Sequence, residues 1–208
     1  EVATMKLAGI LGLRTPECRL ELPGSSHPIG LFSRFDRRDG GRVPYISART
    51  ALGKVGYASG FYTDIADVIR IISARPGDDL LQIWLRMVFG ILVTNTDDHL
   101  KNHGFIYAGQ NLWRLSPLFD VNPQPRRHAQ METGISPIHG HEPDIAAAID
   151  AAEFFDVSVP EARILARDMA RSIRDNWRDE LRRQGLGGAE LSACAPAFEH
   201  ERMDAALG

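Results

Sequence analysis

Five stretches of the chain carry apolar residues at the three-to-four-residue spacing of an α-helix. The spacing predicts helices over residues 2–11, 62–72, 80–93, 145–155 and 162–181. Gly12 is expected to cap the first helix, and Pro76-Gly77 is expected to end the second. The stretch 80–93 has almost no polar face, which predicts a helix buried on nearly all sides.

Two other regions contain short apolar runs separated by turn residues, as paired strands do, and in residues 18–22 the apolar residues alternate with polar ones. Residues 18–22 and 29–32 flank Pro23-Gly24-Ser25-Ser26, and residues 105–107 and 112–115 flank a turn at 108–110. Each pair predicts an antiparallel hairpin. Residues 37–42 are expected to form a turn and residues 117–125 an irregular segment, while a weak helix follows the break at 185–188. The fold class predicted is α+β, mainly helical.

The composition is that of a globular protein. The 208 residues include 44% hydrophobic and 25% charged residues, and the net charge is −3. The mixed charge argues against a general binder of nucleic acid or membrane surfaces. The two cysteines indicate no disulfide framework or structural zinc site. The sequence shows no apolar stretch of transmembrane length and no secretory signal, so a cytoplasmic location is expected.

A polar cluster, Asn95-Thr96-Asp97-Asp98-His99-Leu100-Lys101-Asn102, directly follows the predicted buried helix. A protein kinase needs an aspartate to accept the proton of the substrate hydroxyl, and an asparagine five residues later to hold magnesium. Asp97 and Asn102 have this spacing, and Asp120 follows the second hairpin as a further metal ligand would. Read singly, an Asp–Asn pair in a loop is common, Asp98 is more readily a turn cap and His99 a brace of the loop backbone.

At these residues the chain resembles the HipA family of divergent kinases, known as toxins of bacterial toxin–antitoxin pairs. Three motifs in order carry the resemblance, which spans residues 1 to about 170: Arg34-Phe35-Asp36-Arg37, Thr96 to Asn102, and Pro117-Leu118-Phe119-Asp120. The resemblance implies the mainly helical larger lobe of a kinase at residues 46–208. Residues 1–45 would be a hinge-proximal helix and small sheet left from the smaller lobe.

The resemblance also implies roles for single residues. Asp97 would be the general base, and Asn102 and Asp120 would hold Mg²⁺. The implied nucleotide contacts are Ser33, Arg34, Phe35, His99, Leu100, Lys101, Asn102, Phe119 and Asp120. Ser33 replaces an acidic residue often found at the adenine-contacting hinge, a change that a backbone contact tolerates.

The implied cofactors are ATP and Mg²⁺, and the implied partners are a protein substrate and a DNA-binding antitoxin of the HipB type. No membrane and no direct nucleic-acid contact are expected. A glycine-rich phosphate loop and a strand lysine lie upstream of the opening helix in the family, where Glu1 would be the partner of that lysine. Two alternatives stay open: a catalytically inactive binding or regulatory module, and a metal-dependent phosphohydrolase with Asp97, Asp98, His99 and Asp120 as ligands.

Three further features have plain structural interpretations. The apolar stripe from Leu165 to Leu181 is expected to pack in the core, and His139-Gly140-His141 lacks a third metal ligand at suitable spacing. Arg126-Arg127-His128 is expected to be a solvated loop rather than a contact for phosphate.

Overall fold

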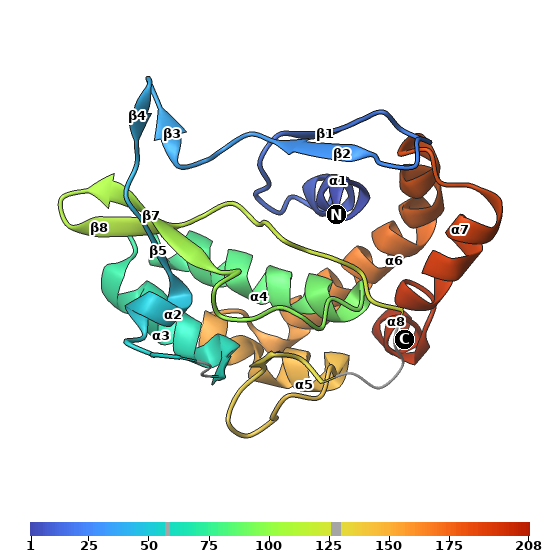
Figure 1. Ribbon diagram of the computed structural model, residues 1–208. Coiled ribbons are helices and arrows are strands. Elements are labelled where there is room, and N and C mark those ends of the chain that lie inside the picture. The colour runs from blue at the N-terminus through green and yellow to red at the C-terminus, as the bar shows by residue number, and fades with distance from the viewer. Residues whose placement is uncertain (57–58, 126–129) are drawn as a thin grey trace.

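The computed structural model describes residues 1–56, 59–125 and 130–208, so Arg126-Arg127-His128 lies outside the described residues. Within these ranges the protein is mainly helical with small sheets of two or three strands (Figure 1). The helices are α1 Val2–Ile10, α2 Ala48–Ala51, α3 Tyr62–Ile72, α4 Pro76–Leu92, α5 Ile145–Asp150, α6 Val159–Arg183, α7 Gly188–Cys194 and α8 Glu201–Leu207, with 3-10 helices at Ala151–Phe155 and Ala195–Ala197. The strands are β1 Cys18–Glu21, β2 Ile29–Phe32, β3 Arg37–Arg38, β4 Gly41–Arg42, β5 Tyr45–Ser47, β6 Gly60–Phe61, β7 Gly104–Gly109, β8 Leu112–Leu115 and β9 Thr133–Gly134.

Helix α4 runs through the centre of the protein, as its apolar sequence predicts (Figure 1). It packs against α3, α5, α6 and α8, and the indole N–H of its buried Trp84 donates to the carbonyl of Ala148 at 2.9 Å. The expectation that Pro76-Gly77 ends the preceding helix is wrong. Helix α3 ends at Ile72, and Pro76 opens α4, because the first turn of a helix needs no N–H from its proline.

The polar cluster begins where α4 ends. Thr94 adopts a left-handed backbone with φ of 53°, which is costly for a β-branched residue. Its hydroxyl donates to the carbonyl of Ala197 at 3.0 Å, and this contact helps to hold the turn. The chain therefore leaves the buried helix abruptly and enters the segment that contains Asp97.

Both predicted hairpins are present. β1 pairs with β2, and β7 pairs with β8, both antiparallel. The sequence did not predict β5, which pairs with β7, or the short parallel pair of β6 and β9. Beyond β8, the N–H of Ser116 bonds to the carbonyl of Gly104 at 2.8 Å, so the sheet directs the chain into Pro117–Asp120.

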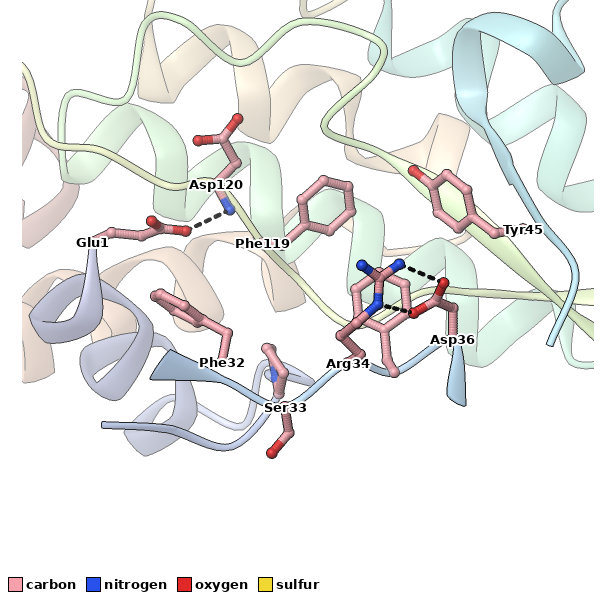
Figure 2. Close-up of a pocket in the computed structure, with 10 residues that line it drawn as sticks. Glu1, Phe32, Ser33, Arg34, Asp36, Tyr45, Phe119 and Asp120 are labelled. Carbon is pink, nitrogen blue, oxygen red and sulfur yellow. Dashed lines mark hydrogen bonds and ion pairs between the residues drawn. The ribbon is translucent and has the colours of Figure 1, made fainter. Parts of the chain in front are cut away.

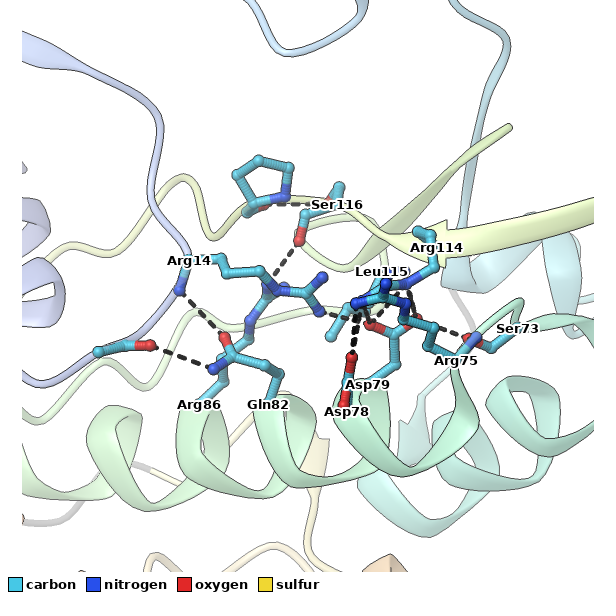
Figure 3. Close-up of polar contacts among 12 residues, drawn as sticks. Arg14, Ser73, Arg75, Asp78, Asp79, Gln82, Arg86, Arg114, Leu115 and Ser116 are labelled. Atoms are coloured by element: carbon cyan, nitrogen blue, oxygen red, sulfur yellow. Dashed lines mark hydrogen bonds and ion pairs between the residues drawn. The ribbon is translucent and has the colours of Figure 1, made fainter. Parts of the chain in front are cut away.

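Two buried charged residues on α4 anchor the segments around this sheet (Figure 3). The carboxylate of Asp79, which is 0% exposed, accepts hydrogen bonds from Arg14, Arg114, Ser73 and the N–H of Leu115. About two helical turns further along, Arg86 donates to the carbonyl of Ser116 at 2.5 Å. Helix α4 thus fixes the strand β8 and the start of the segment that leads to Asp120.

The helices predicted in the second half of the chain are confirmed, with small changes in their bounds. Residues 145–155 split into α5 and a 3-10 helix, α6 covers the predicted stripe with Leu181 buried, and helices α7 and α8 close the chain. The division at residues 45 and 46 stays a prediction. No helix of the described ranges is long and apolar enough to span a membrane.

Candidate functional site

The segment from Thr96 to Asn102 is a tight loop held by its own backbone. The carbonyl of Asp97 accepts hydrogen bonds from the N–H of His99 at 3.1 Å and from the side-chain amide of Asn102 at 3.2 Å. The N–H of Asn102 in turn bonds to the carbonyl of His99 at 2.8 Å. The Asp97 side chain is exposed, whereas that of Asn102 is buried with its amide nitrogen engaged. This arrangement leaves the Asn102 amide oxygen as the atom that could coordinate a metal.

Asp98 is buried, unlike the adjacent Asp97. Its buried carboxylate accepts a hydrogen bond from the Tyr62 hydroxyl and lies 3.1 Å from Nε2 of His103. The interpretation of Asp98 as a turn cap is therefore wrong, since its partners are side chains from α3 and from the residue that precedes β7. Tyr62 and His103 gave no signal in the sequence, because neither belongs to a recognisable motif.

Asp120 ends the segment delivered by β8. Its backbone is left-handed with φ of 58°, a conformation that aspartate tolerates better than most residues. The N–H of Asp120 donates to a carboxylate oxygen of Glu1 at 3.2 Å, and its own carboxylate accepts from the Asn122 amide at 3.0 Å. One hydrogen bond therefore holds the backbone of Asp120, and another holds its exposed carboxylate.

Three hydrogen bonds join the loop of Asp97 to the segment after Asp120. The consecutive residues Thr94, Asn95 and Thr96 each accept one backbone N–H, from Gln124 at 3.0 Å, Asn122 at 3.1 Å and Glu132 at 3.0 Å respectively. Asn95 precedes Asp97 by two residues, and Asn122 follows Asp120 by two. These contacts bring both predicted catalytic segments to one place in the fold.

A cavity of about 470 Å³ opens beside this place. Five predicted nucleotide contacts line it, namely Ser33, Arg34, Phe35, Phe119 and Asp120, together with Glu1, Pro16, Phe32, Asp36 and Tyr45 (Figure 2). The Ser33 side chain points away from Phe119 and Asp120 (Figure 2), which leaves the backbone at this position to face a ligand.

Aromatic rings form one wall of the cavity. The Phe35 ring centroid lies 5.6 Å from that of Phe119 and 6.1 Å from that of Tyr45. The Tyr45 hydroxyl donates to the carbonyl of Lys101 at 3.5 Å, which connects this wall with the loop of Asp97. Tyr45 follows the predicted turn at 37–42 and was missed, since its strand has three residues and shows no periodicity.

The Arg34 side chain is held by an acidic residue two positions further along the chain. Arg34 forms a bidentate pair with Asp36 at 2.7 and 2.8 Å, and Arg37 also donates to Asp36. Hydrogen bonds from Arg34, outweighing some desolvation, lower the pKa of Asp36 to about 2. The pair therefore stays ionised at neutral pH, and Arg34 lies at the cavity with its charge already compensated.

The remaining predicted contacts do not line this cavity. Asp97, Lys101 and Asn102 lie on the adjoining loop, and the His99 ring is half-buried. Leu100 is 3% exposed, so only its backbone could meet a ligand. In the described residues, nothing bonds to Nδ1 of His99, although that nitrogen is buried.

The ligand set of the phosphohydrolase alternative is not assembled. Asp98 faces Tyr62 and His103 instead of joining Asp97. Over the described ranges, no group of three or more His, Cys, Asp and Glu side chains is placed to hold a metal ion. His139 bonds to Ser136 and Asp150, and His141 to the carbonyl of Met131, so both have structural partners.

Sequence comparison places residues 1–177 in the family described as the HipA-like C-terminal domain. Two Sinorhizobium fredii proteins, named "Putative kinase Y4mE" and "Putative kinase Y4dM", are 30% and 32% identical over 132 and 135 residues, in each case 58% of this chain. A Haemophilus influenzae protein with a kinase name is 30% identical over 143 residues, or 60% of this chain. The matched regions cover 31%, 32% and 41% of these relatives, so the chain spans less than half of their length.

Two solved structures share the fold. The HipA chain in the Shewanella oneidensis complex of HipA, HipB and operator DNA superposes with a TM-score of 0.79 at 16% identity, over 100% of this chain and 54% of that one. The Helicobacter pylori proinflammatory kinase CtkA superposes with a TM-score of 0.71 at 14% identity, over 100% and 81%. The fold is thus the α+β, kinase-like fold expected from the sequence. The chain belongs to the HipA-like C-terminal domain family.

Proposed function

We propose that this chain is the catalytic lobe of a serine/threonine kinase that transfers the ATP γ-phosphoryl group to a protein hydroxyl. The observation that carries the proposal is the set of three hydrogen bonds between residues 94–96 and the segment after Asp120. They join a loop with the Asp97–Asn102 spacing of a kinase to a turn that bears a second exposed aspartate. The aromatic cavity beside them suits a nucleotide base.

In this proposal Asp97 accepts the proton of the acceptor hydroxyl and orients the oxygen for attack. Asn102 and Asp120 would hold Mg²⁺, and their oxygen donors match its preference for oxygen ligands. His99 and Lys101 would approach the phosphates, while the backbone from Ser33 to Phe35 and the rings of Phe35 and Phe119 would meet the adenine. Bound MgATP supplies the phosphoryl group, and the chain supplies position and charge.

A glycine-rich phosphate loop and a strand lysine complete this chemistry in kinases. Because the chain spans less than half of its curated relatives, we propose that both come from sequence outside these 208 residues. Glu1, whose carboxylate bonds to the N–H of Asp120, is the proposed partner of that lysine. We further propose a toxin role with a HipB-type, DNA-binding antitoxin as partner, supported by the HipB and DNA present with HipA in the Shewanella structure.

The Asp120→Asn variant tests the metal-binding part of the proposal. In the full-length protein, wild type should bind ATP more tightly with Mg²⁺ than with EDTA and should transfer phosphate to itself or to a protein acceptor. Asn at position 120 removes the charge that attracts the metal, so the Mg²⁺ dependence of ATP affinity, measured by calorimetry, should largely vanish. Asp67→Asn, an exposed change on α3, is the control. Wild type that binds ATP without transferring phosphate would identify a regulatory module instead.

The Phe35→Ala variant tests the assignment of the cavity to adenine. Removing the ring takes away a stacking surface worth about 1–3 kcal/mol per base, so ATP affinity should fall about 5- to 150-fold. Phe154→Ala, at an exposed ring that does not line the cavity, should leave ATP affinity unchanged. If the two variants bind ATP with equal affinity, the assignment of this cavity to adenine is wrong.

A further inference from the structure

Asp97 and Asp98 are neighbours of the same type in opposite environments. Asp97 is exposed, whereas Asp98 is 6% exposed and lies under the loop with Tyr62 and His103, which are 0% and 1% exposed. Burying a carboxylate is costly unless it is paired and hydrogen-bonded. Asp98 is buried in this way and is hydrogen-bonded by Tyr62 and His103. The proposed phosphoryl transfer does not use it. Its position therefore calls for another role.

The partners of Asp98 come from outside the loop. Tyr62 is the first residue of α3, and His103 directly precedes β7. The Tyr62 hydroxyl donates to Oδ2 of Asp98, the same oxygen lies 3.1 Å from Nε2 of His103, and the two rings meet edge to face at 5.2 Å. The loop is thereby connected at its centre to a helix and a strand that the core holds rigid.

The charge state of Asp98 suits this role. Burial by itself would raise the pKa of Asp98, but the His103 ring, the Tyr62 hydroxyl and the guanidinium of Arg86 together hold it below its usual value. Burial, together with the nearby Asp98, raises the pKa of Tyr62 well above its ordinary value. At neutral pH the Asp98 carboxylate is therefore ionised and can only accept, so the Tyr62 hydroxyl is always the donor in their hydrogen bond.

We propose that Asp98, clamped by Tyr62 and His103, is a positioning residue that turns Asp97 toward the acceptor hydroxyl. Asp97 is exposed and the adjacent Asp98 is buried, so holding the Asp98 side chain inward restricts the directions in which Asp97 can project. The clamp also stabilises the backbone that places Asn102 against the carbonyl of Asp97. The inference rests on the proposed kinase function and adds three residues to its site.

The Tyr62→Phe variant is the sharpest test, because it removes one oxygen atom and retains the packing of the ring. In the full-length protein, kcat should fall about 10- to 100-fold, since small misplacements of a catalytic group have effects of this size. KM for ATP should change less than about twofold, because the cavity lies elsewhere. The N–H groups of His99 and Asn102 should exchange faster with solvent, as measured by hydrogen exchange. Tyr107→Phe removes a hydroxyl from an exposed tyrosine of β7, which accepts from the N–H of Asn111, and is the matched control.

Asp98→Asn is the second variant, and it should reproduce the same split between kcat and KM. A folded variant with wild-type kcat and unchanged exchange at His99 and Asn102 would overturn the inference. Global unfolding of both variants would do so as well, because it would assign the cluster to core stability. Hydrogen exchange reports on the loop even if the wild-type protein transfers no phosphate. A failure of the proposed function is therefore distinguishable from a failure of the clamp.

Discussion

The Asp97→Asn variant is expected to lose phosphoryl transfer by about 10²- to 10⁴-fold, the usual contribution of a positioned general base. Asparagine has nearly the same shape but cannot accept the proton of the acceptor hydroxyl. Because the Asp97 side chain is exposed and the loop is held by the backbone carbonyl of Asp97, the variant should fold normally. The measurement is transfer of labelled γ-phosphate in single turnover, with the full-length protein.

Measuring ATP affinity distinguishes a specific loss of phosphoryl transfer in Asp97→Asn from a disruption of the whole nucleotide site. The cavity proposed for adenine is lined by Phe35, Tyr45 and Phe119, among others, and not by Asp97. Affinity for MgATP should therefore stay within about twofold of wild type, and the exposed Asp67→Asn change should alter neither quantity. If Asp97→Asn transfers phosphate as fast as wild type, Asp97 is not the base and the proposed mechanism is wrong.

The Asp79→Asn variant is expected to destabilise the fold by about 3–5 kcal/mol, the cost typical of removing one partner of a buried ion pair. The carboxylate accepts hydrogen bonds from Arg14, Arg114 and the N–H of Leu115, all of which reach it from other parts of the chain (Figure 3). An amide cannot accept from all of them and leaves the arginine charges uncompensated. Urea denaturation followed by circular dichroism measures the change.

The neighbouring Asp78 provides a matched control. Its side chain is 58% exposed, and its ion pairs with Arg75 and Arg114 are long, at 3.5 and 3.7 Å. Such exposed pairs contribute about 0–1 kcal/mol, so Asp78→Asn should change the unfolding free energy by no more than this. Equal effects of the two variants would show that the buried carboxylate does not anchor the sheet.

Acid should reveal the same contribution of Asp79. Burial would raise the pKa of this carboxyl, but hydrogen bonds from Arg114, Ser73, Leu115 and Arg14 outweigh it and lower the pKa. A lowered pKa in the folded state means that the stabilisation is complete above the unfolded value, about 3.9, and is lost as the pH falls below it. The difference in unfolding free energy between wild type and Asp79→Asn should therefore be constant near neutral pH and should shrink in acid.

Helix and hairpin formation could be predicted because their signals are local. The stripe on α6, the apolar run of α4, and the turn residues between β1 and β2 each lie within one stretch of sequence. The loop around Asp97 and the segment ending at Asp120 were recognised for the same reason, since spacing along the chain identifies them. Two short elements without a clear turn signal, the three-residue β5 and the four-residue α2, show no period and were missed.

The sequence alone determined the longer helices, the two main hairpins, the family and the candidate residues for chemistry. The tertiary structure decided which of two adjacent aspartates faces solvent and which is clamped by Tyr62 and His103. It also decided that Asp79 and Arg86, charged residues in an apolar helix, anchor β8 and Ser116. Spacing reports on neighbours along the chain, whereas burial and hydrogen-bond partners depend on segments that can lie more than a hundred residues apart and that only packing brings together.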